Sequence, residues 1–154
     1  MNVVGVVILL VVLLVVLLKV RTHQMEHGEL QTQFTNGTAT ISLLDGDYKG
    51  VAYGYTGSWQ GKTLAASSHT GINRFMKEGA SSTRYPFTFS VGKALRNAGK
   101  DVIILNYNQI GNPWWLRYIV DEMVEVSPDS YLGKVHVKLF PSVVFTLGYF
   151  TLSK

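Results

Sequence analysis

Residues 131–140 read YLGKVHVKLF, and this stretch decides the fold of most of the chain. Its odd-numbered residues are apolar or glycine, whereas three of its even-numbered residues are basic, namely Lys134, His136 and Lys138. Because successive side chains on a strand point to opposite faces, the pattern predicts a strand with one apolar face and one wet face. Such strands are typical of antiparallel sheets.

Seven other segments of strand length accompany this one, and turn-forming residues separate them. The predicted strands cover residues 48–55, 58–66, 71–77, 84–91, 101–107, 114–126, 131–139 and 143–152. No long amphipathic helical period appears after residue 40, which argues against alternating strands and helices. A meander of about eight strands has two open edges, and closure removes them. We therefore expect an all-β, antiparallel up-and-down barrel of about eight strands.

The N-terminus predicts a membrane segment, because residues 3–18 carry no polar side chain and the first charges are Lys19 and Arg21. A helix over the first eighteen residues would cover roughly 27 Å, close to a hydrocarbon core. The alternative is a cleaved signal peptide, but a basic stretch before the apolar run and a small-residue cleavage site are both missing. We predict a single-pass anchor over residues 1–20 that contacts the bilayer, a polar stalk over 21–40 and a barrel domain over 41–154.

The two charges that follow the apolar run indicate the topology of the chain. By the positive-inside tendency they place the barrel domain in the cytoplasm. The remaining 12 Lys and Arg residues nearly balance 10 Asp and Glu residues, so the net charge of +4 does not indicate nucleic acid binding. The chain has no cysteine, which excludes disulfides and thiolate metal sites. Mixed charge and closed strands predict a monomer.

Two motifs resemble a known group of proteins. Residues 57–62 read GSWQGK, a Gly-x-Trp-x-Gly pattern formed by Gly57, Trp59 and Gly61, and residues 121–126 (DEMVEV) precede residues 131–134 (YLGK). The pattern resembles the calycin group (lipocalins, fatty-acid-binding proteins and nitrobindin-like barrels), and most closely the uncharacterised small β proteins of GxWxG type. This resemblance implies a calycin-like barrel with an internal cavity for an apolar or amphipathic ligand. It also implies that Trp59 is a structural plug at the closed end.

The predicted strand 114–126 supplies most candidate ligand contacts. The face that begins with Trp114 and continues through Tyr118 and Glu122 is the more apolar one, so we expect it to face the interior. Tyr107, at the end of the preceding predicted strand, is a further candidate. Arg117 lies on the opposite face and would hold a ligand carboxylate only if that face were interior. The adjacent tryptophans either close the barrel end, or form a rim that grips a ligand or touches lipid headgroups.

The sequence points to binding rather than catalysis. A carboxylate at Glu122 among apolar residues needs a partner, either a ligand's polar end or a structural ion pair. No acid–base couple, nucleophile motif, phosphate loop or three-residue metal cluster stands out, so we expect no catalytic residues, cofactor or metal. We predict a membrane-anchored barrel that binds a small molecule as a carrier or sensor. The alternative is a tethered structural or interaction module whose barrel is filled by its own aromatic side chains.

Overall fold

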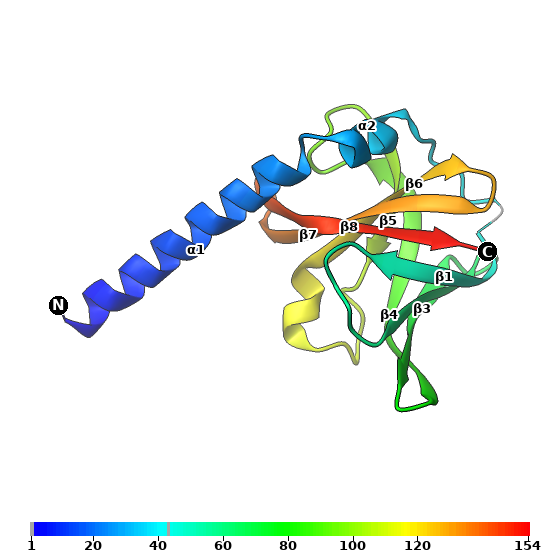
Figure 1. Cartoon of the computed structure of the whole chain (residues 1–154), viewed down its shortest axis with the longest axis horizontal. Helices are drawn as coiled ribbons and strands as arrows, with labels where there is room; N and C mark the ends of the chain where they lie inside the picture. Colours follow the sequence, from blue (N-terminus) through cyan, green and yellow to red (C-terminus); the bar gives the residue numbers. More distant parts are fainter. Residues whose placement is uncertain (1, 43) are drawn as a thin grey trace.

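The computed structural model describes residues 2–42 and 44–154. They form two helices followed by eight strands, with a short 3-10 helix between the fifth and sixth strands (Figure 1). The elements are α1 (Val3–Met25), α2 (Glu29–Asn36), β1 (Gly46–Ala52), β2 (Trp59–Ala65), β3 (Thr70–Lys77), β4 (Ala80–Lys93), β5 (Asp101–Asn106), η1 (Trp114–Tyr118), β6 (Ile119–Ser127), β7 (Ser130–Phe140) and β8 (Val143–Ser153). The eight predicted strands are all present, within a few residues of their predicted bounds except at the starts of β4 and β6.

The strands form a closed antiparallel barrel in which each pairs with the next along the chain. β1 pairs with β8 from Lys49 opposite Ser153 to Ala52 opposite Phe150, and this pairing closes the sheet. Closure removes the free edges that an open sheet of this length would expose. The all-β, up-and-down barrel is confirmed, and its architecture agrees with the calycin-like fold that the two motifs imply.

The two ends of the barrel differ. At the filled end, where β1 begins and β8 finishes, Leu44, Tyr48 and Tyr131 are fully buried, and the two tyrosine rings meet edge to face at 5.7 Å. Ala39 and Ile41, from the segment that precedes β1, pack against this cluster. At the open end, β1 finishes, β2 begins, and η1 lies beside the last residues of β7 (Figure 1).

Two irregularities decide which side chains enter the barrel. A bulge in β2 between Trp59 and Gly61 shifts the alternation, so that Trp59 and Lys62 both face inward. Gly61 takes a φ of +123°, which glycine adopts readily and other residues do not. A second bulge in β4 makes Tyr85 an extra residue opposite β3, with a φ of +64°.

The outer face of β6, β7 and β8 is covered, which corrects two expectations. The segment 21–40, predicted as a stalk, forms the last turns of α1 and all of α2, and Phe34 is fully buried against β6 and β7. The second face of β7 is therefore not wet, since Lys134 and His136 are fully buried. Sequence periodicity missed this cover because α2 has only eight residues, too few to show an amphipathic repeat.

The prediction of which face of residues 114–126 lies inside the barrel was wrong. Residues 114–118 form η1 after Pro113, and β6 begins only at Ile119. Within β6, Asp121 and Met123 point inward, whereas Glu122 and Val124 point outward. The outer face looked like a core face because helix α2 buries it.

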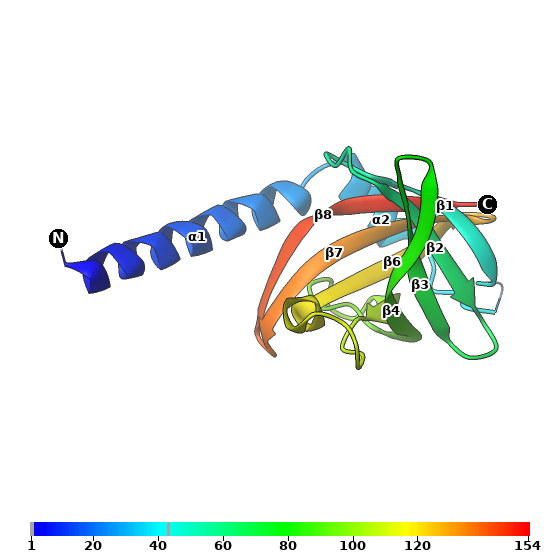
Figure 2. The ribbon, with the colours of Figure 1, turned by 90° about the horizontal axis from the view of Figure 1, so that it is seen from below.

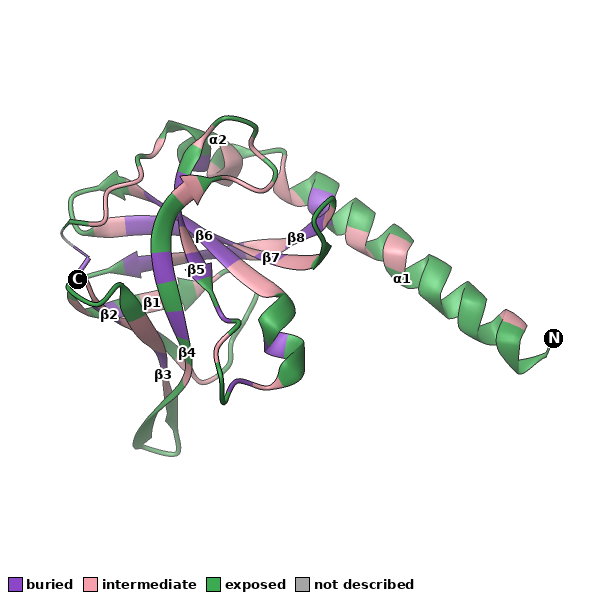
Figure 3. Ribbon diagram, turned by 180° about the vertical axis from the view of Figure 1, so that it is seen from behind, coloured by how far each residue is buried: buried purple, intermediate pink, exposed green. Residues whose placement is uncertain are grey.

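α1 projects from the barrel as a long apolar rod (Figure 2). Residues along its outer part are exposed, whereas buried residues gather in the barrel strands and at Thr22 near the end of the helix (Figure 3). By length and composition α1 can cross a membrane, a property that signal sequences share.

The close backbone approach at the β2 bulge should make one added methyl group destabilising. A Cβ on Gly61 would lie 2.1 Å from the backbone oxygen of Tyr48, so Gly61→Ala should lower the free energy of unfolding by about 2–5 kcal/mol. Gly79→Ala is the matched control, because Gly79 also has a positive φ but has nothing within 4 Å of a Cβ. Its cost should be about 1 kcal/mol. Urea unfolding of the two variants measures the difference, and equal costs would show that the bulge tolerates a side chain.

Candidate functional site

A cavity of about 350 Å³ occupies the open half of the barrel interior. Its wall is mostly apolar and aromatic, and the contributing residues are Ala52, Tyr55, Trp59, Phe75, Tyr85, Leu116, Ile119, Val135 and Phe150. Four polar residues complete the lining, namely Lys62, Asn73, Tyr107 and Asp121. An apolar wall with a few convergent polar groups is the usual form of a small-molecule site.

The polar residues form one connected network around the amine of Lys62. Its Nζ lies 3.1 Å from Oδ2 of Asp121, 2.5 Å from the hydroxyl of Tyr107 and 2.8 Å from Oδ1 of Asn73. The Tyr107 hydroxyl donates to the same Asp121 oxygen at 2.8 Å, and the indole N–H of Trp59 donates to Asn73 at 3.0 Å. All three hydrogens of the amine therefore have an acceptor.

Aromatic rings enclose the rest of the Lys62 amine, and the residue is only 2% exposed. Four ring centroids lie between 5.0 and 5.5 Å from Nζ, those of Trp59, Phe87, Tyr107 and Phe150. A cation above aromatic faces is attracted by their electron density. The rings and the Asp121 carboxylate together offset part of the cost of placing this amine in a dry interior.

Burial changes the proton affinities of the network. Loss of water lowers the pKa of Lys62, although the nearby Asp121 carboxylate opposes this shift. Burial, followed by the repulsion of Asp121, raises the pKa of Tyr107 well above its ordinary value of 10. Tyr107 therefore stays a neutral hydroxyl donor across the physiological range.

A second buried network lies on the outer face of the same strands. Glu122 accepts hydrogen bonds from the backbone N–H of Leu95 and stands 3.1 Å from Nε2 of His136, whose Nδ1 lies 3.2 Å from the hydroxyl of Thr146. In α1, the hydroxyl of Thr22 accepts from the backbone N–H of Thr146 at 3.0 Å.

This carboxylate, imidazole and hydroxyl resemble the order of groups in a hydrolytic triad. Glu122, His136 and Thr146 are, however, all 0% exposed, so a substrate cannot reach the hydroxyl in this structure. The arrangement instead connects the barrel wall to the last turns of α1.

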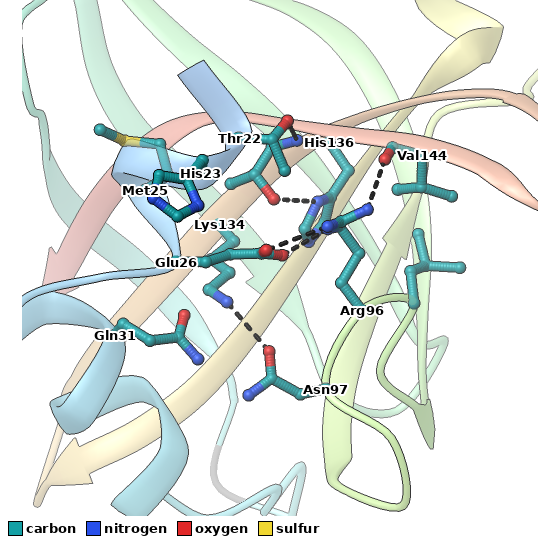
Figure 4. Close-up of polar contacts among 12 residues, drawn as sticks. Thr22, His23, Met25, Glu26, Gln31, Arg96, Asn97, Lys134, His136 and Val144 are labelled. Carbon is teal, nitrogen blue, oxygen red and sulfur yellow. Dashed lines mark hydrogen bonds and ion pairs between the residues drawn. The ribbon is translucent and has the colours of Figure 1, made fainter. Parts of the chain in front are cut away.

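Further contacts fix α1 to the barrel (Figure 4). Both carboxylate oxygens of Glu26 accept from the guanidinium of Arg96, which also donates to the backbone oxygen of Val144 at 2.9 Å. Beside these contacts, Lys134 of β7 donates to Asn97, which lies between β4 and β5, at 3.1 Å. Hydrogen bonding to Arg96 lowers the pKa of Glu26, and burial lowers the pKa of Lys134 to about 8.

The structure does not bring together the ligand-binding residues that the sequence suggested. Tyr107 lines the cavity, but Glu122 lies outside the barrel wall, which corrects its expected interior position. Trp114, Tyr118 and Arg117 are exposed on η1, so none of them reaches the cavity interior. The reason is the 3-10 helix, which a strand pattern cannot anticipate.

Trp59 both packs in the core and lines the cavity. It packs against the core and donates to Asn73, as a structural residue would, yet it also lines the cavity at the open end. The expectation that it plugs the closed end is therefore corrected, because the side chains of Leu44 and Tyr48 fill that end.

Sequence reasoning missed Lys62, Asn73 and Asp121 as cavity residues. One signal was present, since Gly61 stands within the Gly-x-Trp-x-Gly motif, and a bulge there places Lys62 on the same side as Trp59. Asp121 and Asn73 carried no such signal, because which face of their strands turns inward depends on barrel closure and on what covers the outer face.

Within residues 2–42 and 44–154, no group of three His, Asp or Glu side chains is placed to hold a metal ion. No family model, curated protein or solved structure matches the chain. The calycin resemblance therefore has the barrel architecture as its structural support.

Removing one partner of the interior ion pair should cost more stability than removing both. Lys62→Met leaves Asp121 buried without its cation, and should lower the free energy of unfolding by about 3–5 kcal/mol. Adding Asp121→Asn removes the unpaired charge and keeps an acceptor for Tyr107, so the double variant should regain more than half of the loss. Denaturant unfolding of the single and double variants tests this. A cost below about 1 kcal/mol for Lys62→Met would show that the pair is solvated.

Lys134 predicts a pH dependence of stability. Its folded-state pKa of about 8 lies below the ordinary value of 10.5. Between these values the unfolded chain holds a proton that the folded protein has released, so the free energy of unfolding rises with pH from about 8. Lys134→Met should remove this contribution when unfolding is measured from pH 7 to 9.5. Lys138→Met, on the same strand and half-buried, is the control and should keep the rise. Parallel curves for the parent and Lys134→Met would contradict the prediction.

Proposed function

We propose that the chain is a membrane-anchored barrel that binds one small, mainly apolar molecule in the cavity at its open end. The observation that carries the proposal is an apolar cavity of about 350 Å³ with a connected polar network on its wall. Its volume falls at the lower end of the range for ligand pockets. The buried side chains at the filled end, Leu44, Tyr48 and Tyr131 among them, limit the ligand to the open end of the barrel.

The charges of the network favour an uncharged polar end on the ligand. Lys62 and Asp121 already neutralise each other at 3.1 Å. A ligand carboxylate or ammonium would enter as an unpaired charge, at a cost of several kcal/mol. The better match is therefore a neutral group such as a hydroxyl or an amide.

One oxygen atom of the network favours a ligand whose polar end carries a hydrogen-bond donor. The hydrogen bonds that Asp121 receives from Lys62 and Tyr107 both reach Oδ2. Within the described part of the chain no bond to Oδ1 accompanies them, which leaves that oxygen for a ligand hydroxyl or N–H. The amine of Lys62 has all its hydrogens engaged, which favours binding over nucleophilic chemistry at this residue.

The anchoring part of the proposal rests on how α1 meets the barrel. Its last turns carry Thr22 and Met25, which bond to Thr146 and to the hydroxyl of Tyr149. A helix that continues without a break from the apolar run into these contacts supports retention rather than cleavage. Lys19 and Arg21 on the barrel side favour a cytoplasmic barrel by the positive-inside tendency.

The filled-barrel alternative has partial support of its own. The protein's own aromatic and aliphatic side chains fill one end of the interior, Tyr48 and Tyr131 among them. An interaction module with no ligand would need the open half to remain empty as well. Binding experiments separate the two functions directly.

Three probes with unbranched ten-carbon chains and different end groups test the proposal, namely decan-1-ol, decanoate and decyltrimethylammonium. We expect saturable heat release for decan-1-ol with the full chain in lipid nanodiscs, above the signal of empty nanodiscs, and weak or no specific binding of the two ions. Ala52→Trp fills the cavity and should abolish the signal, whereas Val51→Trp, on the exposed neighbouring residue, should leave it unchanged.

Two outcomes would count against this function. Equal binding by Ala52→Trp and the parent would place the ligand elsewhere. No saturable binding of any of the three probes would favour the filled-barrel interaction module.

A further inference from the structure

A group of exposed large side chains lies beside the cavity mouth. Trp114, Trp115 and Tyr118 of η1, with Leu139 and Phe140 at the end of β7, are called here the aromatic rim. They line one apolar hollow, although η1 and β7 come from separate parts of the chain. Trp114 is 73% exposed and Phe140 is 67% exposed. Water-exposed rings gathered in one place mark an interaction surface.

η1 connects the rim to the cavity. Leu116, in the middle of the 3-10 helix, is buried and lines the cavity, while its neighbours Trp115 and Trp114 face outward. The rim therefore borders the open end of the barrel, not the filled end. Any partner that covers the rim also lies next to the cavity mouth.

The rim lies on the side of the barrel toward which α1 extends (Figures 1 and 2). Lys19, the first charged residue after the apolar run, borders a hollow that also includes Ser142 and Val143 of the β7–β8 hairpin. Phe140 directly precedes the two-residue turn of this hairpin, Pro141 and Ser142. The tip of the hairpin is therefore at the level where the apolar part of α1 ends.

The charge of the surrounding segments fits a lipid surface. Residues 107–119 and 137–145 contain no Asp or Glu, and their charged residues are Arg117 and Lys138. Both segments therefore carry positive charge beside the rings. Trp and Tyr are enriched at the headgroup level of membranes, where a ring meets an apolar region and its polar atom meets water. Basic side chains next to them attract anionic headgroups.

We propose that the aromatic rim lies in the headgroup region of the same bilayer that α1 crosses, so that the cavity mouth opens at the membrane surface. The inference rests on the proposed anchoring by α1 but not on ligand binding. Two attachment points, the helix and the rim, fix the tilt of the barrel against the membrane. An apolar ligand would then pass between lipid and cavity without crossing bulk water.

Single cysteines test the contact, because the chain has none of its own. Trp114→Cys and Phe140→Cys place a label on the rim, and Val126→Cys places one at the filled end, where Val126 is 41% exposed. Each full-length variant carries the environment-sensitive fluorophore NBD, in vesicles of phosphatidylcholine with a minority of phosphatidylglycerol. We expect blue-shifted emission at residues 114 and 140, with a large loss of emission when the lipids are brominated near the headgroup. The label at residue 126 should show neither change.

Each other outcome overturns the inference in a distinguishable way. Emission typical of water and no quenching at 114 and 140, in protein that floats with the vesicles after carbonate washing, would show that the rim stands clear of the bilayer while the anchor holds. A blue shift without bromolipid quenching, which grows with the protein-to-lipid ratio, would show that a second copy of the chain covers the rim. Protein that does not float would overturn the anchoring in the proposed function and this inference with it.

Discussion

The pairing of β1 with β8 is the constraint on which the rest of the structure depends, because it gives every strand an inside and an outside. The inside must be filled without strain, and large rings lie beside glycines on neighbouring strands. Gly133 is the register partner of Phe150, and a Cβ at Gly133 would lie 2.1 Å from that ring. Gly71 stands in the same relation to Phe87. Glycine opposite an aromatic residue lets a sheet curve tightly while the ring covers the exposed backbone.

Closure also determines the chemistry of two adjacent carboxylates. Asp121 and Glu122 point to opposite faces of β6, and both side chains are buried. The inner face is enclosed because the barrel closes, and the outer face is covered by α1, residues 94–97 and α2. Each carboxylate therefore has a basic partner, Lys62 inside and His136 outside. Buried ion pairs cost desolvation energy and add little net stability, but they tolerate few alternative arrangements. One strand thus connects the cavity to the contacts that hold α1.

The functional interpretation follows from the position of the open end. The filled end lies where β1 begins, whereas the cavity, η1 and the β7–β8 hairpin share the end toward which α1 extends (Figure 1). A binding site placed there would meet its ligand at the lipid surface, where apolar molecules accumulate. For the proposed ligand, the neutral Lys62–Asp121 pair would accommodate a hydroxyl or amide and would leave an added charge unpaired.

The sequence by itself determined the all-β class, the number of strands and the apolar N-terminal helix, because local periodicity and turn chemistry carry that information. The inward face of β7 was also correct, since Tyr131 and Val135 both face the interior. Alternation failed at the bulge beside Gly61, which turns Lys62 inward. Apolarity indicated the wrong face of β6, because α2 buries the outer face while Asp121 faces the cavity. The burial of Lys134 and His136 was equally invisible, because α1, α2 and the 94–97 segment that cover them are distant in the sequence. Only the tertiary structure decided the site, because a side chain's environment depends on contacts between segments, whereas its strand depends mainly on its neighbours in the chain.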